Sequence, residues 1–359
     1  MTRLRRGTPA HPSAAVALTG GVAVVVAALV AVCGWAPPVA ADPARPTDYR
    51  STVDRLSPPT GDVTVQVRGG DAFLEVTSAP GHEVIVLGYQ DEPYLRFGTD
   101  GTVQRNRRSP ATTINQTRFG TEAPADADPE AEPDWETVAT GGRYAWHDHR
   151  IHWMSPDPPP TAAGDAIFDW TVPMEVDGAD VMVRGTLTRE EGVSPLPWIG
   201  LATLIVAGVL VAAWRGRRRS AILIAAVGAL IGAITASVLG IAEWSTSPPG
   251  AGASPLLVVL PPVAAGLAAG ALGLLAFRRR DLAEVLAFGA VALLAGWVLR
   301  ELPALWKPVL PTELPANVDR AGLTLVMALV IASAVLFVGS RRLRGGRNVK
   351  PAVRPQTSP

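Results

Sequence analysis

Five long apolar runs in the second half of the chain constrain its fold more than any other feature. Each run has 18 to 22 residues. That is enough for an α-helix, rising 1.5 Å per residue, to cross a hydrocarbon core of about 30 Å. The sequence therefore predicts a bundle of five transmembrane helices within residues 195–340, embedded in a lipid bilayer. The runs cover residues 196–214, 220–241, 256–277, 282–299 and 321–339.

The arginine positions predict the orientation of this bundle. Arginine clusters follow the first, third and fifth runs. The basic residues of the loops 242–255 and 300–320 are, by contrast, only Arg300, Lys307 and Arg320. Positive residues collect on the cytoplasmic side of membrane proteins. We therefore expect a multi-pass protein of the cell membrane with a basic cytoplasmic tail, residues 341–359, and an extracytoplasmic region ahead of the first span.

The N-terminus has the pattern of a secretory signal. Three arginines precede an apolar stretch over residues 14–36, and small residues follow up to Ala41. This pattern predicts a signal peptide over residues 1–41, cleaved after Ala41. An uncleaved signal anchor is the alternative, because the apolar stretch is long enough to span a membrane.

The region between signal and spans is acidic. Residues 42–195 contain 13 arginines, no lysine and 26 acidic residues, which gives a formal charge of −13 in a chain whose total is zero. Nucleic acids require basic patches, so we expect no nucleic-acid partner. The one cysteine, Cys33, lies in the N-terminal apolar stretch, so the exported domain has no disulfide. At about 150 residues it can bury enough apolar surface to fold without one.

Residues 42–194 show the short alternating segments of β-strands. Segments such as 63–68 and 83–87 are separated by Gly and Pro, and the turn Asp177-Gly178 joins two segments that predict a hairpin. The pattern favours an antiparallel β-sandwich, with an immunoglobulin-like topology as first candidate. Seven acids in residues 122–136 raise the possibility of a cation site. Their spacing matches no calcium loop, which favours a solvated acidic loop.

The segment richest in chemistry is Trp146-His-Asp-His-Arg-Ile-His-Trp-Met154. Neutral imidazole is a common ligand of copper, zinc and nickel. In a strand, His147 and His149 point to the same side and His152 to the other. His152 joins them only if the chain turns near Asp148 to Arg150.

Two interpretations of this segment remain open. In one, His147, His149 and His152 bind a metal, and Met154 adds a thioether, with Met174 or Met182 as further candidates. Copper suits such a ligand set outside the cytoplasm, since imidazole and thioether together serve both of its oxidation states. In the other, the tryptophans pack into the core, backbone carbonyls satisfy the histidines, and Asp148 and Arg150 fix the local conformation.

Trp146–Met154 also resembles a segment in a family of uncharacterised actinobacterial membrane proteins. Further similar stretches are Val86–Arg96, Asn106–Ala111 and Asp134-Trp135. The resemblance implies a signal peptide, a β-rich ectodomain and a C-terminal bundle of spans. It implies no activity.

Together these features favour a membrane-anchored extracytoplasmic binding or assembly module, with copper as the candidate ligand. A scaffold that docks another cell-envelope protein without metal is the main alternative. An enzyme is less favoured, because the chain lacks a Gly-Xaa-Ser-Xaa-Gly motif and a zinc-protease helix. A transporter is least favoured, because no ionisable residue is expected at mid-membrane depth, the nearest being Glu284.

Overall fold

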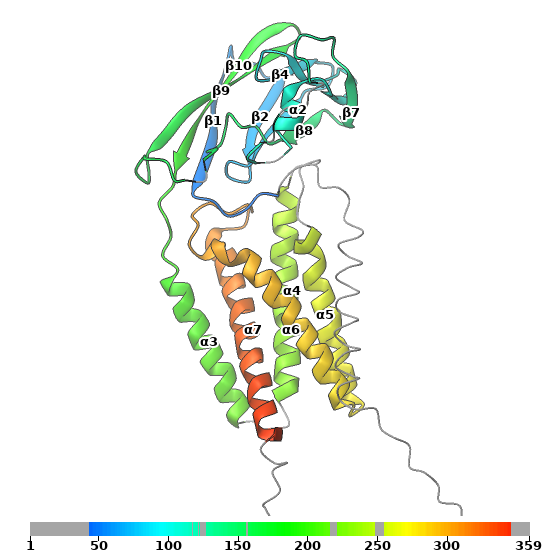
Figure 1. The fold of residues 1–359 in the computed structure, drawn as a ribbon, viewed down its shortest axis with the longest axis vertical. Helices are drawn as coiled ribbons and strands as arrows, with labels where there is room; N and C mark the ends of the chain where they lie inside the picture. The colour runs from blue at the N-terminus through cyan, green and yellow to red at the C-terminus, as the bar shows by residue number, and fades with distance from the viewer. Residues whose placement is uncertain are drawn as a thin grey trace, which may run out of the picture.

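A computed structural model describes residues 43–116, 118–120, 122, 127–155, 157–215, 221–247 and 255–345. A β domain at one end of the molecule is followed by a bundle of long helices (Figure 1). The predicted signal peptide lies outside the described residues, as do residues 346–359 of the predicted tail.

The β domain contains two antiparallel sheets. The larger has seven strands in the order β1-β10-β9-β4-β5-β6-β7, and the smaller has three in the order β2-β3-β8. A short helix, α2 (Pro110–Ile114), lies between β6 and β7. The strands are β1 (Tyr49–Ser57), β2 (Val63–Arg68), β3 (Phe73–Ser78), β4 (Val84–Leu87), β5 (Pro93–Phe97), β6 (Val103–Asn106), β7 (Trp135–Ala139), β8 (Arg143–Trp146), β9 (Ala166–Val176) and β10 (Ala179–Arg189).

The predicted hairpin is formed by β9 and β10. Its turn residues Asp177 and Gly178 both have positive φ angles, 52° and 79°. Two consecutive residues with positive φ are typical of the type I′ turn, which matches the twist of paired strands and favours Asp-Gly. The turn therefore sets the register in which Val176 pairs with Ala179.

One apolar core serves both sheets. Val65, Leu74 and Val76 of the smaller sheet and Val86 and Leu95 of the larger belong to the same buried cluster. Alternate residues of β2 are buried, as a strand with one face on a core requires. The prediction of an antiparallel β region is confirmed.

The predicted acidic loop joins the sheet at its far end. Trp135 begins β7, so Trp135 and Glu136 belong to a strand. Glu136 pairs with Arg105 at 3.2 Å and Asp134 with Arg107 at 2.7 Å. Cross-strand arginines therefore neutralise the last two acids of this stretch.

Five helices are long and apolar enough to cross a membrane, in agreement with the five predicted spans. The largest differences are at α4, which runs five residues past the predicted end, and at α7, which begins five residues before the predicted start and ends six residues past the predicted end. Residues 341–345 of the predicted tail therefore belong to α7. An apolar run stops at the first charged residue, whereas a helix continues while its backbone hydrogen bonds do. The helices are α3 (Leu196–Arg215), α4 (Ala221–Thr246), α5 (Pro255–Ala276), α6 (Arg280–Glu301) and α7 (Ala316–Gly345), with the short 3₁₀ helix η2 (Leu302–Leu305) after α6.

Alanine dominates the interior of the bundle. Such small side chains let helices approach closely, which favours packing in a membrane. Helix α3 packs against α7 at the side of the bundle, and Ala202 is its one buried residue. The fully buried alanines include Ala225, Ala233, Ala236, Ala264, Ala268, Ala271, Ala283, Ala287 and Ala290.

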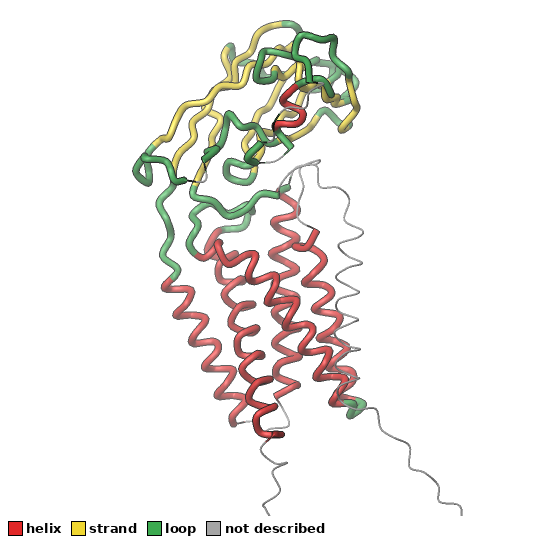
Figure 2. The backbone as a smooth tube through the Cα atoms, viewed as in Figure 1, coloured by secondary structure: helices red, strands yellow, loops and turns green. Residues whose placement is uncertain are grey.

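The β domain rests on the loop between η2 and α7, which we call the junction loop (residues 306–315). Thr47 and Val309 exchange two backbone hydrogen bonds of 2.9 and 3.1 Å, and Val193 N–H donates to the Trp306 carbonyl at 3.1 Å. Lys307 forms an ion pair with Asp48. The segment before β1 thus runs between domain and bundle, and the chain returns to the same loop before α3 (Figures 1 and 2).

Candidate functional site

The histidine segment lies in a loop that begins where β8 ends. Strand β8 stops at Trp146, and a turn follows in which Ile151 N–H donates to the Asp148 carbonyl at 3.1 Å. The alternation of a strand therefore does not extend over the histidines. The turn also meets the condition under which His152 comes to the same side as its neighbours.

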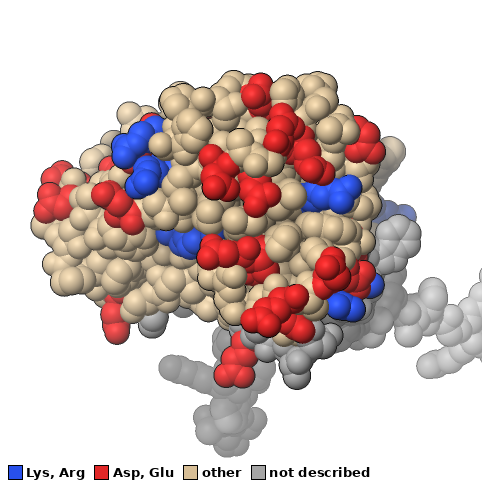
Figure 3. Space-filling model, turned by 90° about the horizontal axis from the view of Figure 1, so that it is seen from above, with Lys and Arg blue, Asp and Glu red and all other residues tan. Residues whose placement is uncertain are grey.

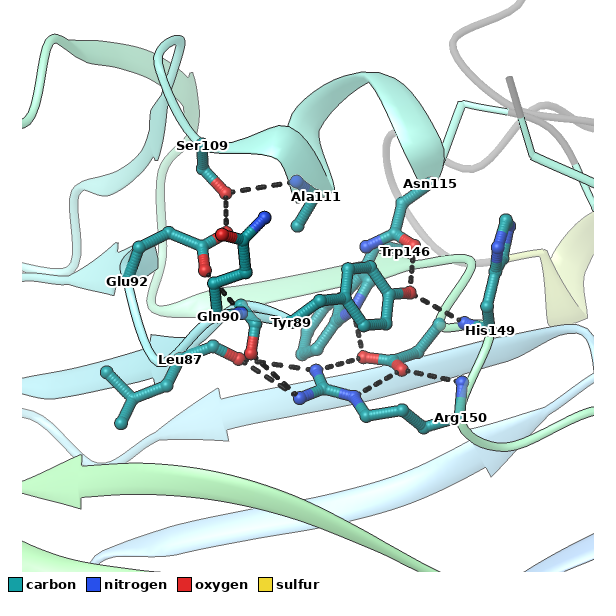
Figure 4. Close-up of polar contacts among 12 residues, drawn as sticks. Leu87, Tyr89, Gln90, Glu92, Ser109, Ala111, Asn115, Trp146, His149 and Arg150 are labelled. Atoms are coloured by element: carbon teal, nitrogen blue, oxygen red, sulfur yellow. Dashed lines mark hydrogen bonds and ion pairs between the residues drawn. The ribbon is translucent and has the colours of Figure 1, made fainter. Parts of the chain in front are cut away.

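Asp148 and Arg150 hold this loop in shape (Figure 4). The Asp148 carboxylate is fully buried and accepts hydrogen bonds from Arg150 Nε at 2.8 Å and Arg150 Nη2 at 2.7 Å. It also accepts one from Trp146 Nε1 at 2.9 Å. Arg150 donates further to the carbonyls of Leu87, the last residue of β4, and of Gly88, which follows it. The pair therefore ties the loop to the larger sheet.

Electrostatics keep Asp148 ionised. Burial raises the pKa of its carboxyl, but the Arg150 charge and the hydrogen bonds from Arg150 and Trp146 outweigh burial and bring that pKa below its ordinary value. A buried carboxylate with three strong donors is a structural anion rather than a general base at neutral pH. The geometry therefore assigns Asp148 to positioning the loop.

Tyr89 covers the other side of this ion pair. The Arg150 guanidinium lies 5.0 Å from the Tyr89 ring centroid, a cation–π distance. The Tyr89 hydroxyl donates to Asn115 Oδ1 at 2.5 Å and accepts from His149 N–H at 3.0 Å (Figure 4). Tyr89 thus links the loop to the end of α2.

His147 is buried and held by a backbone carbonyl. Its Nδ1 lies 2.6 Å from the Ala72 carbonyl oxygen, and its ring stacks on Phe73 with centroids 4.4 Å apart. Because a carbonyl only accepts, Nδ1 carries the proton and Nε2 carries the lone pair. The tautomer of His147 is therefore fixed by the fold.

His152 is held in the same way by another carbonyl. Its Nε2 donates to the Arg118 carbonyl at 2.7 Å, which leaves the lone pair on Nδ1. That Nδ1 is buried and has no hydrogen-bond partner among the described residues. Burial, with a contribution from the Arg118 charge, lowers the pKa of His152 to about 3, so the imidazole is neutral at neutral pH.

The three imidazoles lie side by side. The ring of His152 is 5.2 Å from that of His149 and 6.3 Å from that of His147, both at steep angles. Gly120 makes room for His149: its φ is 72°, and a Cβ there would lie 2.6 Å from His149 Cε1. The loop thus gathers all three predicted histidines.

Gathered rings are not the same as a formed metal site. Within the described residues, no group of three or more His, Cys, Asp and Glu side chains is arranged to hold a metal ion. The predicted thioethers are spread out. Met154 is 36% exposed, Met174 is buried in the β-domain core, and Met182 lies on β10. His82, the other described histidine, forms ion pairs with Asp177 and Asp62 instead.

A cavity of ≈ 620 Å³ opens beside the histidine loop. It is lined by His147, Trp153 and Ser155 of the histidine loop and by Ala72, Arg118, Phe119 and Pro158. The segment from Pro43 to Tyr49 and Lys307 of the junction loop complete the lining. The cavity therefore lies between the β domain and the helical bundle, with one imidazole in its wall.

Several residues of this region carry no signal of their own in the sequence. Tyr89 and Arg118 bond to the loop from other parts of the chain, and Arg118 pairs with the buried Asp71 at 2.5 Å. Burial raises the pKa of Asp71 despite the Arg118 charge.

The structure is consistent with a multi-pass membrane protein: a β domain with a cluster of three imidazoles is followed by five helices that could span a membrane. Comparison with protein-family models, with curated proteins and with solved structures found no match to the chain. Its function therefore has to be argued from the geometry of the site.

Proposed function

We propose that the chain is a membrane-anchored extracytoplasmic module that binds copper through the histidine loop. The supporting observation is Nδ1 of His152, which is buried and has no hydrogen-bond partner among the described residues. The His152 ring lies 5.2 Å from that of His149 and 6.3 Å from that of His147. A buried polar atom without a partner costs free energy unless a ligand supplies one. A metal ion bound at this lone pair supplies it.

The backbone carbonyls act as the outer shell of such a site. A metal-bound histidine usually donates its other ring N–H to a carbonyl or carboxylate, which orients the ring and fixes the tautomer. His147 and His152 both have this arrangement, through Ala72 and Arg118. The same hydrogen bonds would also hold purely structural histidines, so the lone pair of His152 carries the argument.

The ring separation favours a site of low coordination number. Two imidazoles bound to one ion from nearly opposite sides, with bonds of about 2 Å, have centroids roughly 6 Å apart. His147 and His152 are 6.3 Å apart, and His149 is the third candidate ligand at 5.2 Å from His152. Copper(I) accepts two nitrogen ligands, whereas zinc requires about four. Copper(I) therefore fits this loop better than zinc.

Copper(I) titration of the purified full-length protein in detergent, under reducing conditions and against a colorimetric chelator, tests the proposal. We expect one copper per chain in the wild type and none in the double variant His147→Gln/His152→Gln. Glutamine retains a donor for each carbonyl but has no imidazole lone pair. His82→Gln is the matched control, since His82 lies outside the loop. Copper binding that is absent in the wild type, or unchanged in the double variant, overturns the proposal.

A metal-free scaffold for another cell-envelope protein is the second candidate. It is favoured by the separate carbonyl bonds of His147 and His152 and by the stacking of His147 on Phe73. The shared core of two sheets supports the predicted sandwich, which many binding domains adopt, and the immunoglobulin-like topology stays a prediction. The copper titration separates the two candidates, because a scaffold binds no stoichiometric copper.

A further inference from the structure

The cavity at the junction lies at the level where the membrane begins. Lys307, in its lining, comes two residues after Leu305, where the fourth candidate span ends. Val193, which bonds to the neighbouring Trp306, comes three residues before Leu196, where the first span starts. The floor of the cavity therefore adjoins the interface between lipid headgroups and water.

The charge of the lining contrasts with the rest of the β domain. Arg45, Arg118 and Lys307 line the cavity, against the single carboxylate of Asp48. Asp71 lies behind Arg118, so three cations meet two carboxylates. Arg45 is exposed and forms no ion pair with the described residues, while its charge acts on the Glu301 carboxylate at the end of α6. Residues 42–195 carry a charge of −13, and the face turned away from the bundle shows more acidic than basic side chains (Figure 3). A cationic surplus in such a domain favours an anionic ligand.

The exposed apolar side chains of the β domain gather at the same place. Among its described residues, the large hydrophobic side chains that are exposed are Phe119, at 60%, and Met154, at 36%. Phe119 lines the cavity, and Met154 stands between the lining residues Trp153 and Ser155. Exposed aromatic and apolar groups next to cations at the membrane interface are suited to a ligand with both an anionic and an apolar part.

We propose that the cavity binds an anionic phospholipid of the leaflet on the β-domain side. Arg45 contacts the headgroup phosphate, Lys307 and Arg118 add positive potential, and Phe119 contacts the upper part of the acyl chains. Binding of this lipid holds the β domain against the bilayer surface. The inference is independent of copper binding, because its charged contacts come from residues outside the histidine loop.

The test is native mass spectrometry of the full-length protein in detergent micelles, titrated with phosphatidylglycerol and with phosphatidylcholine. We expect the wild type to retain phosphatidylglycerol preferentially. Arg45→Gln should weaken this binding about fivefold, the effect of one basic group near an anionic lipid. Arg50→Gln is the matched control: Arg50 is also exposed, pairs with Glu190 just after the neighbouring strand β10 and does not line the cavity. Phe119→Ser should weaken the binding of both lipids.

Three results would overturn the proposal. The first is equal retention of the two lipids by the wild type, and the second is an equal effect of Arg45→Gln and Arg50→Gln. The third is displacement of phosphatidylglycerol by inorganic phosphate at equal concentration, which would assign the cavity to a small soluble anion. The Arg45→Gln protein should still bind copper as the wild type does, so failure of either proposal leaves the other testable.

Discussion

The β domain and the helical bundle bury different kinds of side chain. Among the described residues, the β domain encloses four carboxylates that are no more than 2% exposed. Asp71, Glu75 and Asp148 are each paired with arginine, and Glu92 accepts hydrogen bonds from Ser109 Oγ and the Gln90 N–H. The bundle encloses mainly alanine, and its buried charged residues Glu284, Glu301 and Arg320 lie near helix ends. Specific polar geometry is therefore concentrated in the β domain, whereas the bundle relies on close approach of helices.

The largest effect is expected from a substitution that removes a buried ion pair of the β domain. Asp148→Ala leaves Arg150 largely buried without its carboxylate and should lower the free energy of unfolding of this domain by about 3–5 kcal/mol. Hydrogen exchange of the β3 and β8 amides in the full-length protein measures the loss. The control is Asp134→Ala, which removes an exposed pair with Arg107 and should change stability by less than about 1 kcal/mol. Equal effects of the two variants would contradict the assigned role of Asp148.

A smaller effect is expected from overfilling the alanine interior of the bundle. Ala268→Leu places a larger side chain at a fully buried position and should destabilise helix packing by about 1–3 kcal/mol. Ala269→Leu, the next residue along α5, is exposed and should be close to neutral. Thermal unfolding of the two variants in the same detergent compares them. If the Ala268→Leu and Ala269→Leu variants have the same melting temperature, the alanine packing does not determine the stability of the bundle.

The smallest expected effect concerns a surface histidine of the β domain. The hydrogen bond to Asp177 raises the pKa of His82 above 6.5, with a contribution from Asp62, and lowers the pKa of Asp177 below 3.8. His82 therefore stabilises the fold fully below pH 6.5 and loses this contribution as pH rises through its raised folded-state pKa. The stabilisation from the Asp177 carboxylate is present above pH 3.8 and is lost as pH falls through its lowered folded-state pKa.

His82→Asn tests this dependence through the melting temperature of the β domain between pH 4 and 9. The wild type should exceed the variant most between the two ordinary pKa values and should approach it at alkaline pH. Asp177→Asn keeps a residue that tolerates the positive φ of the turn, and should abolish the same pH dependence. If the difference in melting temperature between wild type and His82→Asn grows with rising pH, the stabilising role assigned to protonated His82 is contradicted.

Local pattern determined which parts of this fold could be predicted. The five spans and the β9–β10 hairpin follow from uninterrupted apolar length and from Asp177-Gly178, signals contained within single segments. Strands β1, β6, β7 and β8 were not predicted. Both faces of β1 carry polar residues, and β6 and β8 are four residues long without the continuous apolar sequence that marks the equally short β4. Their pairing depends on distant partners.

The candidate site was predictable in its residues but not in its geometry. The spacing of His147, His149 and His152 marks the loop, yet the turn that gathers them depends on Arg150 reaching the Leu87 and Gly88 carbonyls. Likewise, Ala72 and Arg118 fix the tautomers through backbone oxygens, which have no signature in the side-chain sequence. Contacts across 34 to 75 positions of the chain decide what these histidines can do.

The attachment of the β domain to residues 306–309 has a mechanical consequence. The chain enters the domain through Thr47 and leaves it through Val193, and both residues bond to this one stretch of the junction loop. These two attachment points resist rotation of the β domain relative to the bundle, whereas a single flexible linker would allow it. A tilt of α6 against α7 would therefore turn the whole β domain as a rigid lever, and spin-label distances between the domain and the bundle should show one narrow distribution.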